Sequence, residues 1–410
     1  MKNIVVGQSG GPTAVINSSV AGVYASAKHL GVEKVYGMVH GIQGFLQGNL
    51  CDLDDYLFDH TRIEMLKRTP SAFLGSCRYK MPKMAKSPDI YEKIFDIMDQ
   101  HAIDCFFYIG GNDSMDTVKE LSDYAAAHNK KQRFIGVPKT VDNDLPITDH
   151  CPGYGSAAKY IATSMKELIR DNESFGVEKP TVTIVEIMGR HAGWLTAAAA
   201  LSKGDDCAGP DAIYLPEVTF DMDAFLAKIK ALAAVKSSVV IAVSEGVKLA
   251  DGRFVCELGQ ASDFVDAFGH KQLSGCAAVL AGRIAAETGL KTRSIEFSTL
   301  QRAATHIASL TDINEAFQVG YDAVKAAHEG KSGMMITLDR NADEPYQCGT
   351  GIYDIHDIAN VERPLPAEWI TEDGCGLNNG FLKYARPLIM GELTPLFVDG
   401  VPHHLVRQKY

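Results

Sequence analysis

Two carboxylates lie close together in the stretch PKTVDND, where Asp142 and Asp144 follow Lys139 and Thr140. Carboxylates at this spacing resist simultaneous ionisation unless a cation lies beside them. Lys139 supplies one cation, and Mg²⁺ is the usual other. A carboxylate so placed can act as general base on a substrate hydroxyl, as in phosphoryl transfer. An Asx-rich turn without catalytic function is the alternative.

Two pairs of glycines, at positions 10–11 and 110–111, each separate an apolar segment from the start of an expected helix. Backbone N–H groups in such turns can approach an anion closely, and the helix dipole favours negative charge there. Neither GQSGGPT nor GGNDS matches the GxGxxG or P-loop pattern. Each alone is equally compatible with an ordinary tight turn, in which Asp113 or Ser114 caps the helix. Two such turns in one domain favour a phosphate site.

A third polar segment, MGRHAGW, ends another apolar run. Gly189 lets the backbone approach a ligand, and Arg190 is a forked donor suited to phosphate or carboxylate. His191 follows directly. A histidine at a helix start more often caps or packs, so we leave it out of the candidate site.

These segments must be positioned by the secondary structure between them. Short β-branched or aromatic runs alternate with helical segments, and continuously apolar strands in this order are typical of parallel sheets covered on both faces. Ligands of such sheets bind beyond the carboxyl ends of the strands, which is where the polar segments fall. We expect a helix that begins at Pro88 after the N-cap Ser87, and strands at 2–7, 105–111, 133–140, 181–189, 238–246 and 333–338.

The composition excludes several classes of protein. A chain of 410 residues exceeds the size at which a single core usually divides, so we expect two domains. A formal net charge of -11 argues against nucleic-acid binding. The nine cysteines show no CxxC or zinc-like spacing, so we expect neither a disulfide framework nor structural zinc. No apolar run suits a signal peptide or a membrane span, and we expect a cytoplasmic protein without membrane contact.

Taken together, the polar segments resemble the phosphofructokinase family. The stretches SGGPTAVIN, FLGSCR, IGGNDS, PKTVDND, IVEIMGR and AVSEG occur in the family's order and with similar spacing across residues 1–250, and the rest matches more loosely. The resemblance implies an α/β fold of two doubly wound, Rossmann-like domains with mostly parallel sheets and an active site in the cleft between them. We expect 1–150 with about 265–325 to form the phosphoryl-donor domain, and 151–264 with about 326–410 to form the sugar-phosphate domain.

The resemblance also implies roles for individual residues. Gly11 would lie against the phosphoryl donor, and Arg78 would contact the phosphate that is transferred. Asp142 corresponds to the base that removes the proton from the 1-hydroxyl of the sugar. The other substrate-binding positions are Thr140, Val141, Met188, Gly189, Arg190 and Glu245.

A Mg²⁺ cofactor is implied as well, with Asn112 and Asp144 as candidates for the metal site. The family position at Asn112 is usually an aspartate near Mg²⁺. An amide there can ligate through its oxygen or hold a metal-bound water, and Asp142 or Asp144 can compensate for the missing charge.

Asp113 and Lys139 bear on the choice of donor, because family members that use ATP carry glycine at both positions. Members that use pyrophosphate carry Asp and Lys there, as this chain does. A carboxylate in the space of the α-phosphate of ATP adds bulk and like charge. Two such charges about 4 Å apart repel by roughly 4 kcal/mol at an intermediate dielectric, about a thousandfold in affinity. Lys139 would offset the charge shared by pyrophosphate and the moving phosphoryl group.

We therefore expect reversible phosphoryl transfer from pyrophosphate to the 1-hydroxyl of fructose 6-phosphate. The alternatives are an ATP-dependent enzyme and a non-catalytic regulatory subunit of the same fold. A dinucleotide-dependent oxidoreductase is disfavoured, since no GxGxxG is followed by an acidic residue about 20 positions later.

The sequence departs from the family at positions that usually carry arginine. Leu273 replaces one in GHKQLSG, and Thr181 is the nearest residue to another. We expect Lys271 and Arg302 to hold the 6-phosphate instead; the alternative for Arg302 is an exposed helix arginine. The absence of these two arginines predicts little allosteric control. The family forms dimers and tetramers, so we expect a homodimer or homotetramer.

Overall fold

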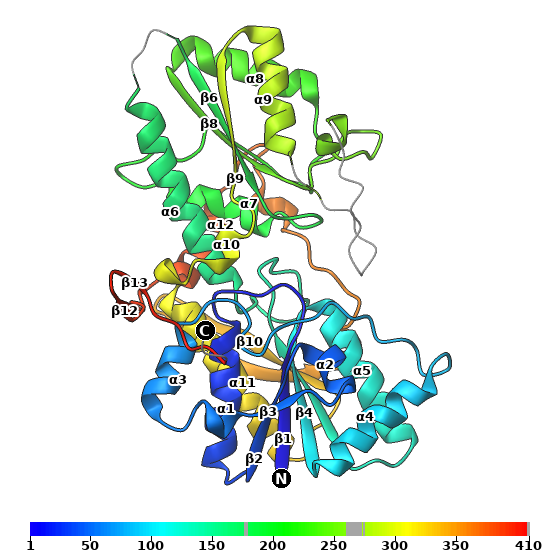
Figure 1. The fold of residues 1–410 in the computed structure, drawn as a ribbon. Coiled ribbons are helices and arrows are strands. Elements are labelled where there is room, and N and C mark those ends of the chain that lie inside the picture. The colour runs from blue at the N-terminus through cyan, green and yellow to red at the C-terminus, as the bar shows by residue number, and fades with distance from the viewer. Residues whose placement is uncertain (176–178, 260–272, 274, 408–410) are drawn as a thin grey trace.

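The computed structural model describes residues 1–175, 179–259, 273 and 275–407. Two sheets organise the chain, the larger in the lower part of Figure 1 and the smaller in the upper part. Helices cover both faces of each sheet, as expected for two α/β domains. None of the helices within these residues is both long enough and apolar enough to cross a membrane.

The larger sheet has seven strands in the order β11-β10-β5-β4-β1-β2-β3. Its central strands are parallel, whereas β3 runs antiparallel to β2 and β11 antiparallel to β10. The parallel strands end at one edge, so the segments after β1, β4 and β5 meet there. The strands are β1 (Asn3–Gln8), β2 (Lys34–Met38), β3 (Leu50–Asp52), β4 (Ile103–Gly110), β5 (Arg133–Pro138), β10 (Met334–Asp343) and β11 (Tyr346–Asp354).

Alternate residues of β1 enter two different cores, which shows that both faces of this sheet are covered. Ile4 and Val6 pack against α1 (Ile16–His29) and α11 (Leu310–His328), whereas Val5 packs with α4 (Pro88–Gln100) and α5 (Asn112–Ala127). A strand buried on both faces must be apolar throughout, which explains the continuous run that was used to predict it. Helix α4 begins at Pro88 as expected, but the Ser87 hydroxyl makes no capping hydrogen bond.

The smaller sheet has four parallel strands in the order β7-β8-β6-β9. One face packs on α6 (Tyr154–Glu173), α7 (Trp194–Ala197) and α12 (Asn379–Ala385), and the other on α8 (Met222–Val235) and α9 (Cys276–Thr288). The strands are β6 (Thr181–Ile187), β7 (Ala212–Tyr214), β8 (Ser238–Ser244) and β9 (Lys291–Glu296). Shorter elements are α2 (Gly41–Leu46), α3 (His60–Lys67), α10 (Leu300–Ala303), β12 (Phe397–Val398) and β13 (Val401–Pro402).

Sheet membership differs from the expected division of the chain. The sequence predicts that 265–325 belongs to the first domain. In the described part of that segment, β9 is a strand of the smaller sheet and α9 packs on that sheet, whereas α11 packs beside α1. The segment 326–410 was assigned to the second domain, but β10 and β11 extend the larger sheet. Glycines explain the position of α11. A Cβ on Gly22 would lie 2.0 Å from the carbonyl oxygen of Phe317, and one on Gly320 would lie 2.1 Å from that of Ser19, so the two helices touch through their backbones.

Candidate active site

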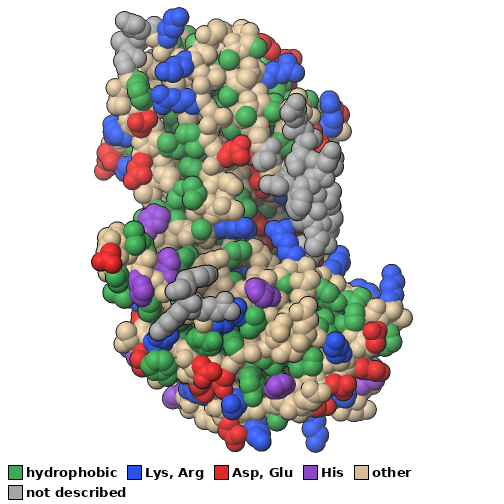
Figure 2. Space-filling model, in the orientation of Figure 1, with side chains coloured by type: hydrophobic (Ala, Val, Ile, Leu, Met, Phe, Trp, Pro, Cys, Tyr) green, Lys and Arg blue, Asp and Glu red, His purple; other side chains and the backbone are tan. Residues whose placement is uncertain are grey.

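A cavity of about 310 Å³ lies between the two domains, at the carboxyl ends of β1, β4, β5, β6 and β8. Both domains contribute to it, as expected for a ligand cleft in parallel sheets. Figure 2 shows Lys and Arg side chains at the junction of the two domains. The cavity is lined by Ser9, Gly10, Gly11, Arg78, Gly111, Asn112, Asp113, Ser114, Lys139, Thr140, Asp142, Asp144, Met188, Arg190, His191, Ala192, Glu245 and Glu362.

Most of the residues singled out from the sequence line this cavity. Val141 instead packs its side chain into the core of the second domain. Neither Gly189 nor Arg302 belongs to the lining, and Gly189 donates its backbone N–H to Glu245. Lys271 lies outside the described residues. The predicted residues in the lining are Gly11, Arg78, Asn112, Asp113, Lys139, Thr140, Asp142, Asp144, Met188, Arg190 and Glu245.

Lys139 joins the first glycine turn to the segment after β5. Its side chain is only 3% exposed, and Nζ donates a hydrogen bond of 2.7 Å to the carbonyl oxygen of Gly11. Burial lowers the pKa of Lys139 to about 8, although the charge of Asp142 opposes the shift. A partly desolvated ammonium held against the glycine turn is well placed to attract an anion bound there.

The two carboxylates after β5 share the cavity with this lysine. Burial raises the pKa of Asp142, against the charges of Lys139 and Arg302, which lower it. Burial and then the charge of Asp142 raise the pKa of Asp144 to about 7. The hydroxyl of Thr140 accepts a hydrogen bond of 3.1 Å from the backbone N–H of Asp142 and fixes the turn. A raised pKa brings the proton affinity of a carboxyl group closer to that needed for proton transfer at physiological pH.

Arg302, on α10, lies against the first glycine turn rather than on an exposed helix surface. A Cβ added to Gly11 would be 2.7 Å from Nη1 of Arg302, so glycine at this position makes room for the guanidinium. Burial, followed by the charge of Arg78, lowers the pKa of Arg302, while Asp142 and Glu245 oppose the shift. Arg302 therefore lies within the electrostatic field of the cavity.

On the side of the second domain, the segments after β6 and β8 rest directly on one another. A Cβ on Gly246 would be 2.2 Å from the carbonyl oxygen of Arg190, so only glycine fits. The backbone N–H of Gly189 donates to Oε1 of Glu245 over 3.3 Å. Burial raises the pKa of Glu245 to about 7. His191, which we excluded as a capping or packing residue, lines the cavity beside Arg190.

The side chain of Asn112 is bound to the C-terminal part of the chain. Its Nδ2 donates to the carbonyl oxygen of Val361 over 2.7 Å, and its Oδ1 accepts from the backbone N–H of Asn360. This contact brings the neighbouring Glu362 into the cavity lining. Sequence reasoning missed Glu362, because it lies in an irregular segment and no motif surrounds it.

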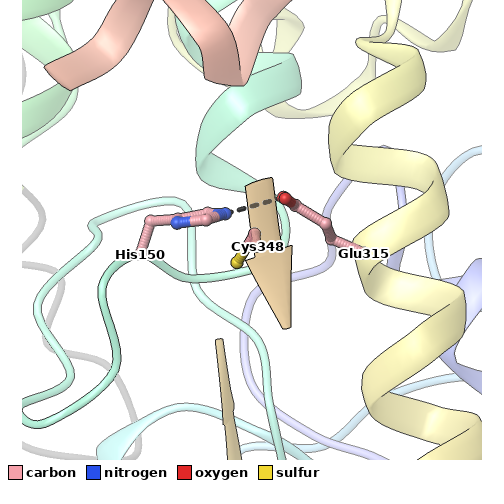
Figure 3. A group of neighbouring side chains, drawn as sticks. All are labelled: His150, Glu315 and Cys348. Carbon is pink, nitrogen blue, oxygen red and sulfur yellow. Dashed lines mark hydrogen bonds and ion pairs between the residues drawn. The ribbon is translucent and has the colours of Figure 1, made fainter. Parts of the chain in front are cut away.

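The segment that carries Asp142 and Asp144 is anchored at its far end by His150, which is 1% exposed. Nε2 of His150 lies 2.6 Å from Oε2 of Glu315, as Figure 3 shows, and Nδ1 lies 2.7 Å from Oδ2 of Asp149. The ligand atoms of His150, Glu315 and Cys348 lie within 4.8 Å of one another, which is close enough for a metal site. Both ring nitrogens already face carboxylates, so ion pairing accounts for the cluster.

The glycine turns, buried cations and paired carboxylates, all at the ends of parallel strands, define a phosphotransferase of the α/β class. Comparisons with known proteins specify the family. A profile described as Phosphofructokinase matches residues 3–327. The chain therefore belongs to the phosphofructokinase family.

Relatives match along nearly the whole chain. The Pyrophosphate--fructose 6-phosphate 1-phosphotransferase of Halomonas elongata is 40% identical over 402 residues, which cover 98% of this chain and 94% of that protein. The enzyme of the same name from Methylococcus capsulatus is 39% identical, with 98% and 95% covered. A crystal structure of pyrophosphate-dependent phosphofructokinase from Nitrosospira multiformis has a TM-score of 0.89 and 39% identity, with 99% of this chain and 96% of that chain covered.

Proposed function

We propose that the protein transfers a phosphoryl group reversibly from pyrophosphate to the 1-hydroxyl of fructose 6-phosphate, giving fructose 1,6-bisphosphate and phosphate. The observation that carries the proposal is the bond between Lys139 and Gly11, which joins the donor turn to the segment of Asp142 in a single cavity. The similarity to two proteins named for this activity supports it.

In this mechanism the first domain binds the donor. Backbone N–H groups of the two glycine turns, with Lys139 and Arg78, bind pyrophosphate and offset the charge that develops as the phosphoryl group moves. Asp142 accepts the proton of the sugar hydroxyl, and its raised pKa increases its affinity for that proton. The residues that would hold the sugar phosphate are Thr140, Met188, Arg190, Glu245 and Arg302.

The carboxylates present fit a Mg²⁺ ion. Asp144 and Glu362 line the cavity beside the base Asp142, and carboxylate oxygens are ligands that Mg²⁺ prefers. Both ends of the Asn112 amide bond to the C-terminal segment, so we assign ligation to the carboxylates and give Asn112 the role of holding that segment. When bound, Mg²⁺ would neutralise negative charge on the oxygens of the donor.

Asp113 would restrict the donor to pyrophosphate. It lines the cavity at the start of α5, next to the second glycine turn. A carboxylate at that position repels a further phosphate group by roughly 4 kcal/mol at about 4 Å, which favours the shorter donor. We also propose, from the family resemblance, that the chain forms a homodimer or homotetramer in the cytoplasm, with little allosteric control.

Substitution of the base tests the proposal. Asp142→Asn keeps the shape of the side chain but removes its ability to accept a proton, so turnover should fall by roughly 10²–10⁴-fold. Calorimetry should show that pyrophosphate and fructose 6-phosphate still bind. Asp357→Asn, which changes an exposed aspartate outside the cavity lining, is the control and should leave turnover unchanged. Near-normal turnover of Asp142→Asn would contradict the proposed mechanism.

A further inference from the structure

A short C-terminal segment, the strap (residues 360–363), crosses between the two domains. Before it, Ala359 is buried in the core of the first domain; after it, Leu365 is buried in the core of the second. Figure 1 shows this part of the chain in orange, passing from one domain to the other. The strap lies beyond the residues matched by the family profile, which end at 327.

The first half of the strap is bound to the first two turns of α5, on the donor side of the cavity. Asn112 holds both Asn360 and Val361, as described above. Asn360 also donates from Nδ2 to Oδ1 of Asp116 over 2.8 Å. These contacts leave Glu362 in the cavity lining and direct the next residue toward the opposite wall.

The second half of the strap is bound to the segment that carries the paired carboxylates. The backbone N–H of Arg363 donates to the carbonyl oxygen of Asp144 over 2.8 Å. Its guanidinium donates from Nη1 to the carbonyl oxygens of Thr148 and Asp149, at 2.7 and 2.8 Å, and from Nη2 to that of Asn143 at 2.9 Å. One arginine thus binds four backbone carbonyls of this segment.

The guanidinium is fixed on its other side by Trp194 of α7. Its central carbon lies 4.8 Å from the centre of the indole ring, and Nε1 of Trp194 donates to the carbonyl oxygen of Arg363 over 3.0 Å. Among the described residues, no carboxylate lies within ion-pair distance of this arginine. Carbonyl dipoles and an aromatic face therefore balance its charge.

The segment that Arg363 binds has a backbone that needs external support. Asn143, between the two carboxylates, has a φ of 55°, and Ile147 has a φ of 70°. Left-handed backbone costs about 1–3 kcal/mol for residues other than glycine, and it is most unfavourable for β-branched side chains such as isoleucine. Strain of this size persists only where surrounding contacts hold it, and Arg363 supplies such contacts on both sides of Ile147.

We propose that Arg363 is a positioning residue for phosphoryl transfer: it holds the segment of Asp142 and Asp144 in its reactive geometry, and the strap couples that segment to Asn112 on the donor side. The proposal rests on the proposed function, because it assumes that Asp142 is the base. Arg363 does not line the cavity, so it acts through the backbone of the segment and not on the substrates.

The expected effect is a loss of turnover with little loss of binding. A misplacement of reacting groups by about 1 Å can cost about a hundredfold in rate. Arg363→Ala should therefore lower kcat by about a hundredfold, while KM for pyrophosphate changes by less than about threefold. Millimolar guanidinium should restore part of kcat, since the small cation can occupy the vacated site between Trp194 and the carbonyls. Arg363→Lys keeps the charge and one donor group and should retain more activity than the alanine variant.

Arg386→Ala is the matched control, because Arg386 also donates to two backbone carbonyls, those of Leu201 and Lys203, outside the cavity lining. It should leave kcat within about twofold of the unmodified protein and should not respond to guanidinium. If Arg363→Ala does not fold, Arg363→Lys is used for the test instead. Its kcat should then fall by a larger factor than its KM for pyrophosphate changes.

Two results would overturn the proposal: a folded Arg363→Ala protein with nearly normal kcat, or a loss of kcat that guanidinium does not restore and that Arg386→Ala reproduces. Absence of turnover in the unmodified protein would instead refute the proposed function. The two failures are therefore distinguishable.

Discussion

Protonated His150 should stabilise the fold at neutral pH and lose this effect in alkali. Burial alone would lower the pKa of His150, but the charges and hydrogen bonds of Glu315 and Asp149 outweigh burial and raise the pKa to about 9, from 6.5 in the unfolded chain. The folded protein therefore keeps a proton that the unfolded chain releases. The contribution of protonated His150 to the free energy of unfolding is complete below pH 6.5 and is lost as the pH rises through about 9. The difference between the two pKa values corresponds to roughly 3 kcal/mol in the free energy of unfolding, at about 1.4 kcal/mol per pH unit.

The measurement compares His150→Asn with the unmodified protein in urea unfolding at several pH values. The difference in free energy of unfolding should be largest near pH 6.5 and shrink by about 3 kcal/mol by pH 9.5. His356→Asn is the control. The hydrogen bond to Asp354 also raises the pKa of His356, but its side chain is 48% exposed, so solvent screens its two ion pairs and the difference should vary with pH much less than for His150→Asn. A difference for His150→Asn that is independent of pH would refute the reasoning.

Other substitutions test the packing, the metal site and the donor filter. Gly320→Ala should lower the free energy of unfolding by about 1–3 kcal/mol through overpacking against α1. Gly282→Ala is the control: it lies in α9 with no atom within 4 Å of the added Cβ, so it should be neutral or slightly stabilising. Urea unfolding compares the two variants. Glu362→Gln should raise the Mg²⁺ concentration needed for half-maximal pyrophosphate binding about fivefold, by calorimetry, and an unchanged requirement would remove Glu362 from the metal site. Asp113→Gly combined with Lys139→Gly should improve ATP binding by up to about a thousandfold, measured by competition with pyrophosphate; unchanged ATP affinity would contradict the filter.

Local sequence signals were sufficient to predict β1, β4, β5, β6, β8 and β10, and most of the candidate residues that line the cavity. The two glycine turns and the segments of Asp142, Arg190 and Glu245 each follow a buried apolar strand, and strand ends in parallel sheets meet at one edge. Gly11, Asp113 and Asp142 could therefore be assigned to one site although they are far apart in the sequence. The structure places all three in the lining.

Contacts between distant segments could not be predicted in the same way. The apolar pattern of β10 predicts a strand but does not say which sheet the strand joins. β9 is mostly polar and only partly buried, so its sequence gives no strand signal. The close backbone contact of α1 with α11 has no local signature beyond two glycines. Glu362 and Arg363 lie in an irregular segment, and their positions depend on bonds to Asn112 and to the backbone after Asp142. Such bonds are visible only once the chain is folded.

The most direct test of the account is the turnover of fructose 6-phosphate with Mg²⁺ when pyrophosphate and ATP are supplied at equal concentrations. We expect turnover with pyrophosphate and none with ATP, because Asp113 and Lys139 both line the cavity and would select the shorter donor. Turnover with ATP alone would contradict this account of the donor while leaving the family assignment intact. Absence of turnover with either donor would contradict the proposed function itself.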